Sequence, residues 1–546
     1  MLASGIARGL LALALLTRLP SAIAEGVDDA LRDLVASGPV PYTSVPVPAR
    51  DAPDLRRFYE ERAFGLAWHD EASPRPARTQ ALELLVASDS HGLDPRDYRG
   101  ELLVAEAAAL ERSPNASPRD LAALDVALTA SLLRYLDDLH AGRVRPQAIH
   151  PELHVAPRPV DRVALIREAI AAERVSDLAD RVAPSVLLYS RLRAALAAYR
   201  DLAARGPWPP LPAARKGDRG STYAGVGVLR SRLAALGDLA PGAVVPPAPR
   251  YDGELVAAVK RFQSRHGLAP DGVLDPATRA ALDVPPAERV RQIELAMERL
   301  RWLPEFPARP LVVVNIPAFR LWVFDLPDDA RAPTLAMRVV VGKALDTETP
   351  VLADTLRTIE FSPNWNVPRS ILQNELLPRL KRDPGYLARQ GMEFVAPDGT
   401  VISRADAASL AALEAGALRV RQRPGPANPM GRIKFVLPNN LAIFLHDTSS
   451  PRLFARQRRD FSHGCIRVEQ PVELALFALD GAPGWDAERV HAAMSAGKPS
   501  YAQLRRPLTV LVFYTTAVVD ANGAPHFYAD IYGHDRRLTQ ALSAPR

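Results

Sequence analysis

Apolar residues recur at helical spacing through the first two hundred positions of this chain. Between residues 30 and 205 the sequence is rich in Ala, Leu, Arg and Glu, and residues 121–139 show the helical repeat most clearly. The histidines in this stretch occur singly or around a proline, so they form no evident metal site. The pattern predicts a helical scaffold domain over residues 25–218.

A shorter helical pattern follows, and it has clear start and stop signals. Leu255, Val259 and Phe262 mark one face of a helix that Gly267 ends, and Asp275 followed by a proline marks the start of another helix. We expect a three-helix module. It spans residues 219–284 and is inserted into the scaffold, whose return helix takes residues 285–309.

Beyond Pro310 the helical period gives way to short runs of β-branched and aromatic residues, which predict strands. These runs are residues 311–316, 320–324, 337–341, 355–361, 441–445 and 508–514. They predict a mostly β domain over residues 310–516, followed by a C-terminal segment, 517–546. The expected fold is thus multidomain α+β.

Helical and proline-rich sequence interrupts the predicted strands between about residues 370 and 432. Long interruptions of a β domain often carry function, because loops and lids tolerate such variation at the edge of a rigid sheet. We therefore predict a helical or loop insertion that acts as a lid.

The first residues are typical of a secretory signal. Arg8 precedes an apolar run, and residues 22–24 form a small-x-small cleavage site, so residues 1–24 are predicted to be a signal peptide cleaved near Ala24. The stretch between Arg8 and Arg18 is too short to span a bilayer. The alternative is that the segment stays uncleaved and tethers the protein to the membrane. If it is cleaved, the protein contacts the membrane only transiently, through the signal peptide.

Composition and charge narrow the range of functions. With 48% hydrophobic and 24% charged residues, the 546-residue chain is too apolar for general disorder. A net charge of +6 favours binding to anionic surfaces in general. Nucleic-acid binding would call for a basic face with base-reading or stacking residues, and the sequence shows no such face. The single cysteine, Cys465, excludes an internal disulfide.

That cysteine lies in the sequence Ser-His-Gly-Cys, and its setting indicates a nucleophile. A thiol is mostly protonated at neutral pH, so it needs a base, and His446, nineteen positions earlier at the end of a predicted strand, is the candidate that would ionise it. Gly464 has no side chain, so the backbone N–H groups of Gly464 and Cys465 are expected to act as oxyanion donors.

Other interpretations of these residues remain. Cys465 has the alternative of being a buried small apolar residue, and His446, Asp447, His463 and Cys465 are suitable zinc ligand types without a familiar ligand spacing. His463 is nearer to Cys465 in sequence, but positions i and i+2 of an extended chain stand roughly 6 to 7 Å apart. Closeness in sequence is therefore not contact.

The motif HDTSSPRLFARQRRDFSHGCIRV resembles the active-site signature of the L,D-transpeptidases with a YkuD-like catalytic domain. VNIPAFRLWVF, VVVGKALDTETP and PNWNVP are similar to earlier segments of that family. The helical stretch VLRSRLAALGDL, with AVKRFQSRHGLAPDGVLDPATRAAL, resembles a peptidoglycan-binding module. The order of the parts resembles the large periplasmic members of Gram-negative bacteria.

The resemblance implies a role for each matching residue. It makes Cys465 the nucleophile and His446 the general base and acid, with Gly464 and Cys465 supplying the oxyanion N–H groups. The backbone carbonyl of Asp447 would orient the imidazole. Arg467 would help to organise the pocket or meet a stem-peptide carboxylate. The other expected substrate-binding residues of the cleft are Ser462, His463, Asn364 and Trp365. Phe444 stands where large relatives carry tyrosine.

The expected reaction is acyl transfer on peptidoglycan that makes 3→3 cross-links through a cysteine thioester, with no cofactor or metal. The alternatives are an L,D-carboxypeptidase, a transpeptidase that attaches lipoproteins, and a non-catalytic wall-binding scaffold. The expected partners are peptidoglycan stem peptides, glycan strands and other cell-wall synthesis enzymes, in the periplasm. Acceptor choice and oligomeric state do not follow from the sequence.

Overall fold

The computed structural model describes residues 21–38, 41–42, 50–70, 73–113, 116–156, 158–212, 222–240, 250–305, 310–325, 333–345 and 347–544. Residues 1–20 of the predicted signal peptide lie outside the described residues. The chain divides into two compact units: one contains Met1–Ala141 and Pro159–Ala183, and the other contains Gly142–Arg158 and Pro184–Arg546.

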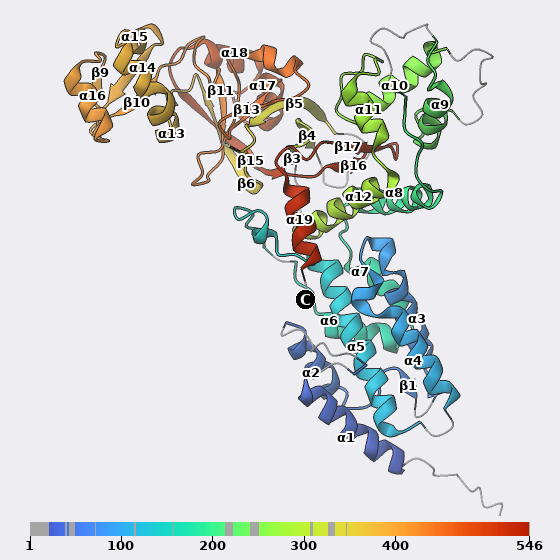
Figure 1. Ribbon diagram of the computed structural model, residues 1–546. Helices are drawn as coiled ribbons and strands as arrows, with labels where there is room; N and C mark the ends of the chain where they lie inside the picture. Colours follow the sequence, from blue (N-terminus) through green and yellow to red (C-terminus); the bar gives the residue numbers. More distant parts are fainter. Residues whose placement is uncertain are drawn as a thin grey trace, which may run out of the picture. The chain divides into compact units, whose positions relative to one another are not determined.

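The first unit is a bundle of helices, drawn in blue and cyan in Figure 1. A two-residue hairpin, β1 His69–Asp70 with β2 Ser73–Pro74, is a small addition to the helices. The helices are α1 Ser21–Ser37, α2 Ala52–Glu60, α3 Pro76–Val86, α4 Gly100–Arg112, α5 Pro118–Ala141, α6 Arg162–Ala171 and α7 Leu178–Val182. The scaffold prediction of helix is confirmed for this stretch.

Helix α5 forms the centre of this unit, because it is buried along most of its length. Its Asp125 is fully buried and accepts hydrogen bonds from the backbone N–H groups of Ala67 and Trp68 and from the Tyr59 hydroxyl. A buried carboxylate with several donors is satisfied. Asp125 therefore holds the turn before β1 in place and is not a catalytic group.

The second unit begins with α8 Leu187–Ala204, which packs against α12 Pro286–Arg301 (Figure 1). Between them in sequence lie α9 Val226–Ala235, α10 Gly253–Arg265 and α11 Pro276–Asp283, with a shared apolar core. Asp275 caps α11 by accepting a hydrogen bond from the Thr278 N–H, as its sequence predicts. The three-helix module is confirmed.

A nine-stranded sheet forms the β domain, and it closes on itself because β5 pairs with β4 as well as with β14. Its order is β13-β5-β14-β12-β11-β6-β15-β3-β4. The strands are β3 Leu311–Asn315, β4 Arg320–Phe324, β5 Leu335–Gly342, β6 Leu352–Phe361, β11 Ile433–Val436, β12 Leu445–His446, β13 Asp460–Ser462, β14 Ile466–Val468 and β15 Ser500–Phe513. The multidomain α+β prediction is confirmed.

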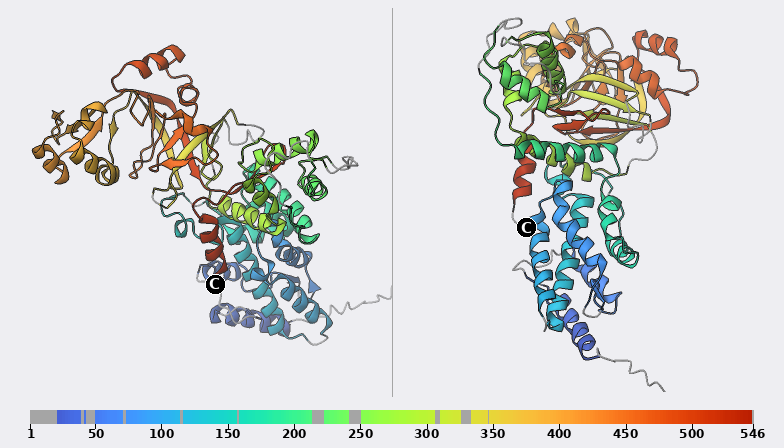
Figure 2. Two further views of the ribbon diagram at one scale, coloured as in Figure 1. Left: turned by 45° about the horizontal axis from the view of Figure 1, so that its top comes forward. Right: turned by 90° about the vertical axis from the view of Figure 1, so that its right-hand side faces the viewer.

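Three helices and a hairpin complete this domain. They are α17 Pro471–Ala478, α18 Ala487–Ser495, the hairpin of β16 Ala517–Val519 with β17 Pro525–Phe527, and α19 His534–Ser543. The last two belong to the segment 517–546, for which the sequence predicts no structure. Figure 2 shows the curved sheet from two further directions, with these elements in orange and red.

The insertion contains a small sheet of its own, which the prediction of helix and loop missed. Strands run in the order β7-β10-β8-β9, and a separate apolar core lies beneath them. The strands are β7 Trp365–Asn366, β8 Met392–Val395, β9 Val401–Ile402 and β10 Arg419–Gln422, with helices α13 Arg369–Ile371, α14 Leu377–Arg382, α15 Tyr386–Arg389 and α16 Ala407–Glu414 and a π-helix, Leu372–Leu376. Strands this short leave little periodic signal.

The predicted strand 441–445 is wrong except at its end. Strand β12 has two residues, and before it Ala442 adopts a φ of 57°. The Asn439 side chain accepts hydrogen bonds from the N–H groups of Leu441 and Ile443, which draws this segment into a turn. The apolar Ile443 is therefore buried in a turn and does not belong to a strand.

The division into two units differs from the predicted domain boundaries, since α8 falls within the predicted scaffold but belongs to the second unit. Those boundaries stay predictions. Among the described helices, none combines the length and the apolar character that a membrane span needs.

Candidate active site

Cys465, directly before β14, and His446, on the neighbouring strand β12, face the same side of the sheet. Strand β12 runs parallel to β14, with His446 beside Arg467 and Leu445 beside Ile466. The Ile466 N–H donates to the Phe444 carbonyl, which places Cys465 next to Phe444. Because side chains alternate along a strand, Cys465 and His446 project from the same face while Leu445 and Ile466 enter the core.

The imidazole of His446 is buried, and its orientation is fixed. Its Nδ1 lies 2.5 Å from the Asp447 carbonyl oxygen, so Nδ1 carries the proton and Nε2 keeps its lone pair. The Asp447 carboxylate instead accepts the Arg432 N–H at 2.8 Å. Burial lowers the pKa of His446 to about 3, and the Arg467 guanidinium acts in the same direction.

The Cys465 thiol is also held in its neutral form. Its sulfur lies 3.4 Å from the Ala442 carbonyl oxygen, to which the S–H donates. Burial raises the pKa of the thiol, whereas the Phe444 N–H, Lys434 and Arg467 oppose that rise. The resting pair is therefore thiol and imidazole, and differs from the ion pair expected from the sequence, because both groups are desolvated.

The turn that presents Cys465 uses a glycine and a buried serine. Gly464 has a φ of 106°, and a Cβ there would stand 3.1 Å from Ile443 Cδ1. The Ser462 hydroxyl donates to the Cys465 carbonyl at 2.5 Å and accepts the Gly464 N–H at 3.2 Å. Ser462 is thus buried and shapes the turn, and its expected contact with a substrate stays a prediction.

These contacts also bear on the predicted oxyanion donors. The Gly464 N–H is already bonded to Ser462, whereas the Cys465 N–H has no acceptor within the described parts of the chain. The backbone N–H of Cys465 is therefore the donor that remains available to a substrate oxygen.

Two residues that the sequence analysis missed hold this turn from behind. The buried Thr349 hydroxyl donates to the Gly464 carbonyl and accepts the Gly342 N–H, both at 2.7 Å. The Tyr532 hydroxyl, from the C-terminal segment, accepts the Thr349 N–H at 3.2 Å and donates to the Gly342 carbonyl at 2.6 Å. Thr349 lies in the segment VVVGKALDTETP, but the sequence does not indicate its contact with Gly464 or that of Tyr532 with Gly342, since these groups meet only in the folded chain.

We expect Tyr532→Phe to weaken this support. It leaves the Thr349 N–H and the Gly342 carbonyl without their buried partner, which should lower the free energy of unfolding by about 1 to 3 kcal/mol. Urea titration of the variant measures this loss. Tyr501→Phe is the control, because the Tyr501 side chain is exposed; equal stability of Tyr532→Phe and wild type would contradict the role.

The other predicted substrate contacts are not all gathered around the thiol. Arg467 is half-buried, contacts the Thr448 hydroxyl at 3.5 Å, and has no carboxylate within ion-pair range among the described residues. His463 Nε2 lies 2.7 Å from Glu375 Oε1 in the insertion. Arg467 thus suits an anionic ligand, whereas His463 links the turn to the insertion.

Asn364 and Trp365 lie between strand β6 of the nine-stranded sheet and the insertion, and Trp365 begins β7. Both are half-buried; Trp365 pairs in register with Gln422 and packs on the core of the insertion. No described cluster of His, Cys, Asp or Glu has the arrangement of a metal site. The structure also separates the zinc ligand types weighed above, because His463 and the Asp447 carboxylate turn to other partners.

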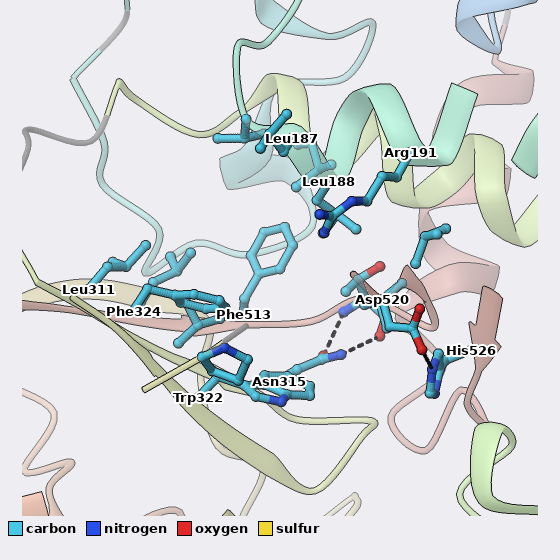
Figure 3. Close-up of a pocket in the computed structure, with 18 of the residues that line it drawn as sticks. Leu187, Leu188, Arg191, Leu311, Asn315, Trp322, Phe324, Phe513, Asp520 and His526 are labelled. Atoms are coloured by element: carbon cyan, nitrogen blue, oxygen red, sulfur yellow. Dashed lines mark hydrogen bonds and ion pairs between the residues drawn. The ribbon is translucent and has the colours of Figure 1, made fainter. Parts of the chain in front are cut away.

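A cavity of about 320 Å³ lies elsewhere in this unit, against β3, β4 and β15. Figure 3 shows Trp322, Phe324 and Phe513 opposite Leu187 and Leu188, with the Asp520–His526 pair at one end. Neither Cys465 nor His446 lines this cavity. Its lining is mainly apolar and does not include the thiol–imidazole pair, so this cavity is separate from the candidate active site.

Comparisons with known proteins divide the chain into three matched parts. Residues 53–196 match a scaffold domain, residues 222–282 match a "Putative peptidoglycan binding domain", and residues 309–485 match the L,D-transpeptidase catalytic domain called YkuD. A curated relative from Haemophilus influenzae, named "Putative L,D-transpeptidase", is 33% identical over 251 residues. The match covers 46% of this chain and about half, 49%, of that relative.

Two solved structures are also similar. An L,D-transpeptidase from Xylanimonas cellulosilytica is 17% identical and covers 55% of this chain and 99% of that one, with a TM-score of 0.17. One from Stackebrandtia nassauensis is 15% identical and covers 56% and 97%, with a TM-score of 0.21. Scores this low do not by themselves establish a common fold. By these matches, the chain is similar in turn to a scaffold domain, to a putative peptidoglycan-binding domain and to the YkuD catalytic domain of L,D-transpeptidases.

Proposed function

We propose that this protein is an exported, periplasmic L,D-transpeptidase that forms 3→3 cross-links in peptidoglycan. The observation that carries the proposal is the placement of Cys465 and His446 on one face of adjacent strands, with the imidazole Nδ1 bonded to a backbone carbonyl. Its partners would be stem peptides and glycan strands, with the matched binding module engaging the wall.

In the first half-reaction the sulfur of Cys465 attacks the carbonyl carbon of the third residue of a tetrapeptide stem. The thiol proton passes to His446 Nε2 as the S–C bond forms, which suits a pair that is neutral at rest. The Cys465 N–H donates to the developing oxyanion. The imidazolium then protonates the amine of the terminal D-alanine, which leaves, and a thioester remains on Cys465.

In the second half-reaction the amine of another stem attacks the thioester. His446 accepts a proton from this amine and returns one to the sulfur as the new amide bond forms. The half-buried Arg467 guanidinium, which has no carboxylate partner among the described residues, would bind a carboxylate of the stem. Water or a lipoprotein lysine would use the same thioester, and acceptor choice separates these reactions.

Mass spectrometry of the products from purified tetrapeptide fragments tests the proposal. We expect a dimer that has lost one D-alanine, and an equal amount of released D-alanine. A shortened monomer alone would indicate a carboxypeptidase, and no change in the fragments would contradict acyl transfer. The same incubation with Cys465→Ala is the control.

A further inference from the structure

A row of polar side chains crosses the sheet beside the thiol. The cross-strand register pairs Arg467 with His446, His446 with Lys434, Lys434 with Glu360, and Glu360 with Tyr501. Residues directly opposite each other on adjacent strands project from the same face. The row therefore places Lys434 next to the imidazole and Glu360 one strand beyond it, and neither residue has a role in the proposed reaction.

The Lys434 side chain extends toward Phe444, the residue that lies beside Cys465. Its Nζ lies 4.0 Å from the centre of the Phe444 ring, and Phe444 is the neighbour of Cys465 across β12 and β14. On the other side, Nζ lies 3.4 Å from Glu360 Oε2. The side chains are 16% and 10% exposed, respectively, so solvent screens this pair little.

We propose that Lys434 is a positioning residue of the active site, whose ammonium group stabilises negative charge on the Cys465 sulfur while Glu360 holds it and offsets part of its charge. The inference rests on the proposed nucleophilic role of Cys465. A cation beside a desolvated thiol favours formation of the thiolate, because little water competes with the interaction, and the position of Nζ over the Phe444 ring brings the charge of Lys434 to the side of Cys465.

The charged groups around the sulfur come from several elements. His446 on β12, Arg467 on β14 and Lys434 on β11 face it, with Glu360 on β6 behind Lys434. The His463–Glu375 contact lies on the side of the insertion. Lys434 lowers the pKa of the thiol more than Arg467 does, although burial raises it further.

Lys434 and Arg467 differ in what restrains them. Glu360 holds Lys434 in place, whereas Arg467 has only the Thr448 hydroxyl and no carboxylate among the described residues. A substrate carboxylate would neutralise Arg467 when it binds. The Lys434–Glu360 pair would not change on substrate binding, so the part of the Lys434 charge that Glu360 does not offset would still act on the sulfur in the substrate complex.

Alkylation of the full-length protein by iodoacetamide between pH 6 and 10 tests the proposal. The thiolate displaces iodide, a C–S bond forms, and the thiol proton goes to solvent, so the rate follows thiolate formation. Intact-mass measurement gives the rate. We expect Lys434→Met to react about tenfold more slowly at pH 8, and its rate profile to move to higher pH.

Two further variants separate charge from structure. Lys434→Arg keeps the charge and should react within about threefold of wild type, whereas Glu360→Gln removes the opposing charge and should react severalfold faster. Lys498→Met, at an exposed lysine, should leave the rate unchanged. The proposal is overturned if Lys434→Met keeps the wild-type profile, or if Glu360→Gln slows alkylation as Lys434→Met does.

This test does not depend on the proposed function, because alkylation requires no peptidoglycan substrate. A shifted profile in a protein that makes no cross-links would support Lys434 and contradict transpeptidation. If Lys434→Met kept the wild-type profile while the wild-type protein made cross-links, the result would contradict the role of Lys434 and support transpeptidation.

Discussion

Replacing Cys465 with alanine should reduce cross-link formation and D-alanine release by roughly 10³-fold or more, because no other thiol exists in the chain to form the thioester. Among the described residues, the Cys465 S–H donates one long hydrogen bond, to the Ala442 carbonyl at 3.4 Å, and alanine keeps the Cβ. The free energy of unfolding should therefore change by about 1 kcal/mol or less. Product analysis by mass spectrometry, with urea titration of the same sample, measures both effects.

The controls for this variant address folding and wall binding. Cys465→Ala should bind isolated sacculi as wild type does, since the matched binding module at residues 222–282 is unchanged. Turnover by Cys465→Ala at a rate near that of wild type would contradict a thioester mechanism. Normal wall binding without turnover would agree with it, because the account assigns wall binding to the matched module and turnover to Cys465.

Replacing His446 with glutamine should lower turnover by about 10²- to 10⁴-fold, the range that a general base and acid contributes. Glutamine fills part of the buried site but has no group that takes a proton at neutral pH. His463→Gln is the matched control, because His463 contacts Glu375 of the insertion. We expect it to retain turnover within about fivefold of wild type.

The His446→Gln substitution should also change how the stability of the protein depends on acid pH. The pKa of His446 is lowered from 6.5 to about 3 in the folded protein, so the unfolded chain takes up its proton first as pH falls. Its contribution to stability is present above about pH 6.5 and is lost as pH falls toward 3. Thermal unfolding of His446→Gln should therefore depend less on pH in that window.

A different outcome would reassign the base. If His463→Gln lost turnover as severely as His446→Gln, the histidine nearer in sequence would be acting on the thiol. If His446→Gln retained full turnover, proton transfer through this imidazole would be excluded.

Part of the fold can be predicted from the sequence, because some elements are marked by residues next to one another in the chain. Asp275 before Pro276 marks the start of α11, and the β-branched runs mark β3 and β4. The pairing of Cys465 with His446 was a hypothesis from chemistry, and the parallel register of β12 with β14 brings the two residues onto one face.

What the sequence does not show depends on contacts between distant segments. Asn439 turns an apolar run away from strand geometry, and Ser462 uses its hydroxyl on the turn that it belongs to. Tyr532 reaches Thr349 across 183 positions, and Lys434 meets Glu360 only when β11 and β6 pair. Charge state is also collective, because burial keeps both His446 and Cys465 neutral at rest.

Acid-quenched mass mapping of the enzyme during turnover tests the central claim most directly. Wild-type protein mixed with tetrapeptide fragments, quenched at low pH and digested, should carry the mass of the stem without its terminal D-alanine on the peptide that contains Cys465, and hydroxylamine should remove it. Cross-linked product formed while that peptide stays unmodified, or an adduct on any other residue, would contradict the account.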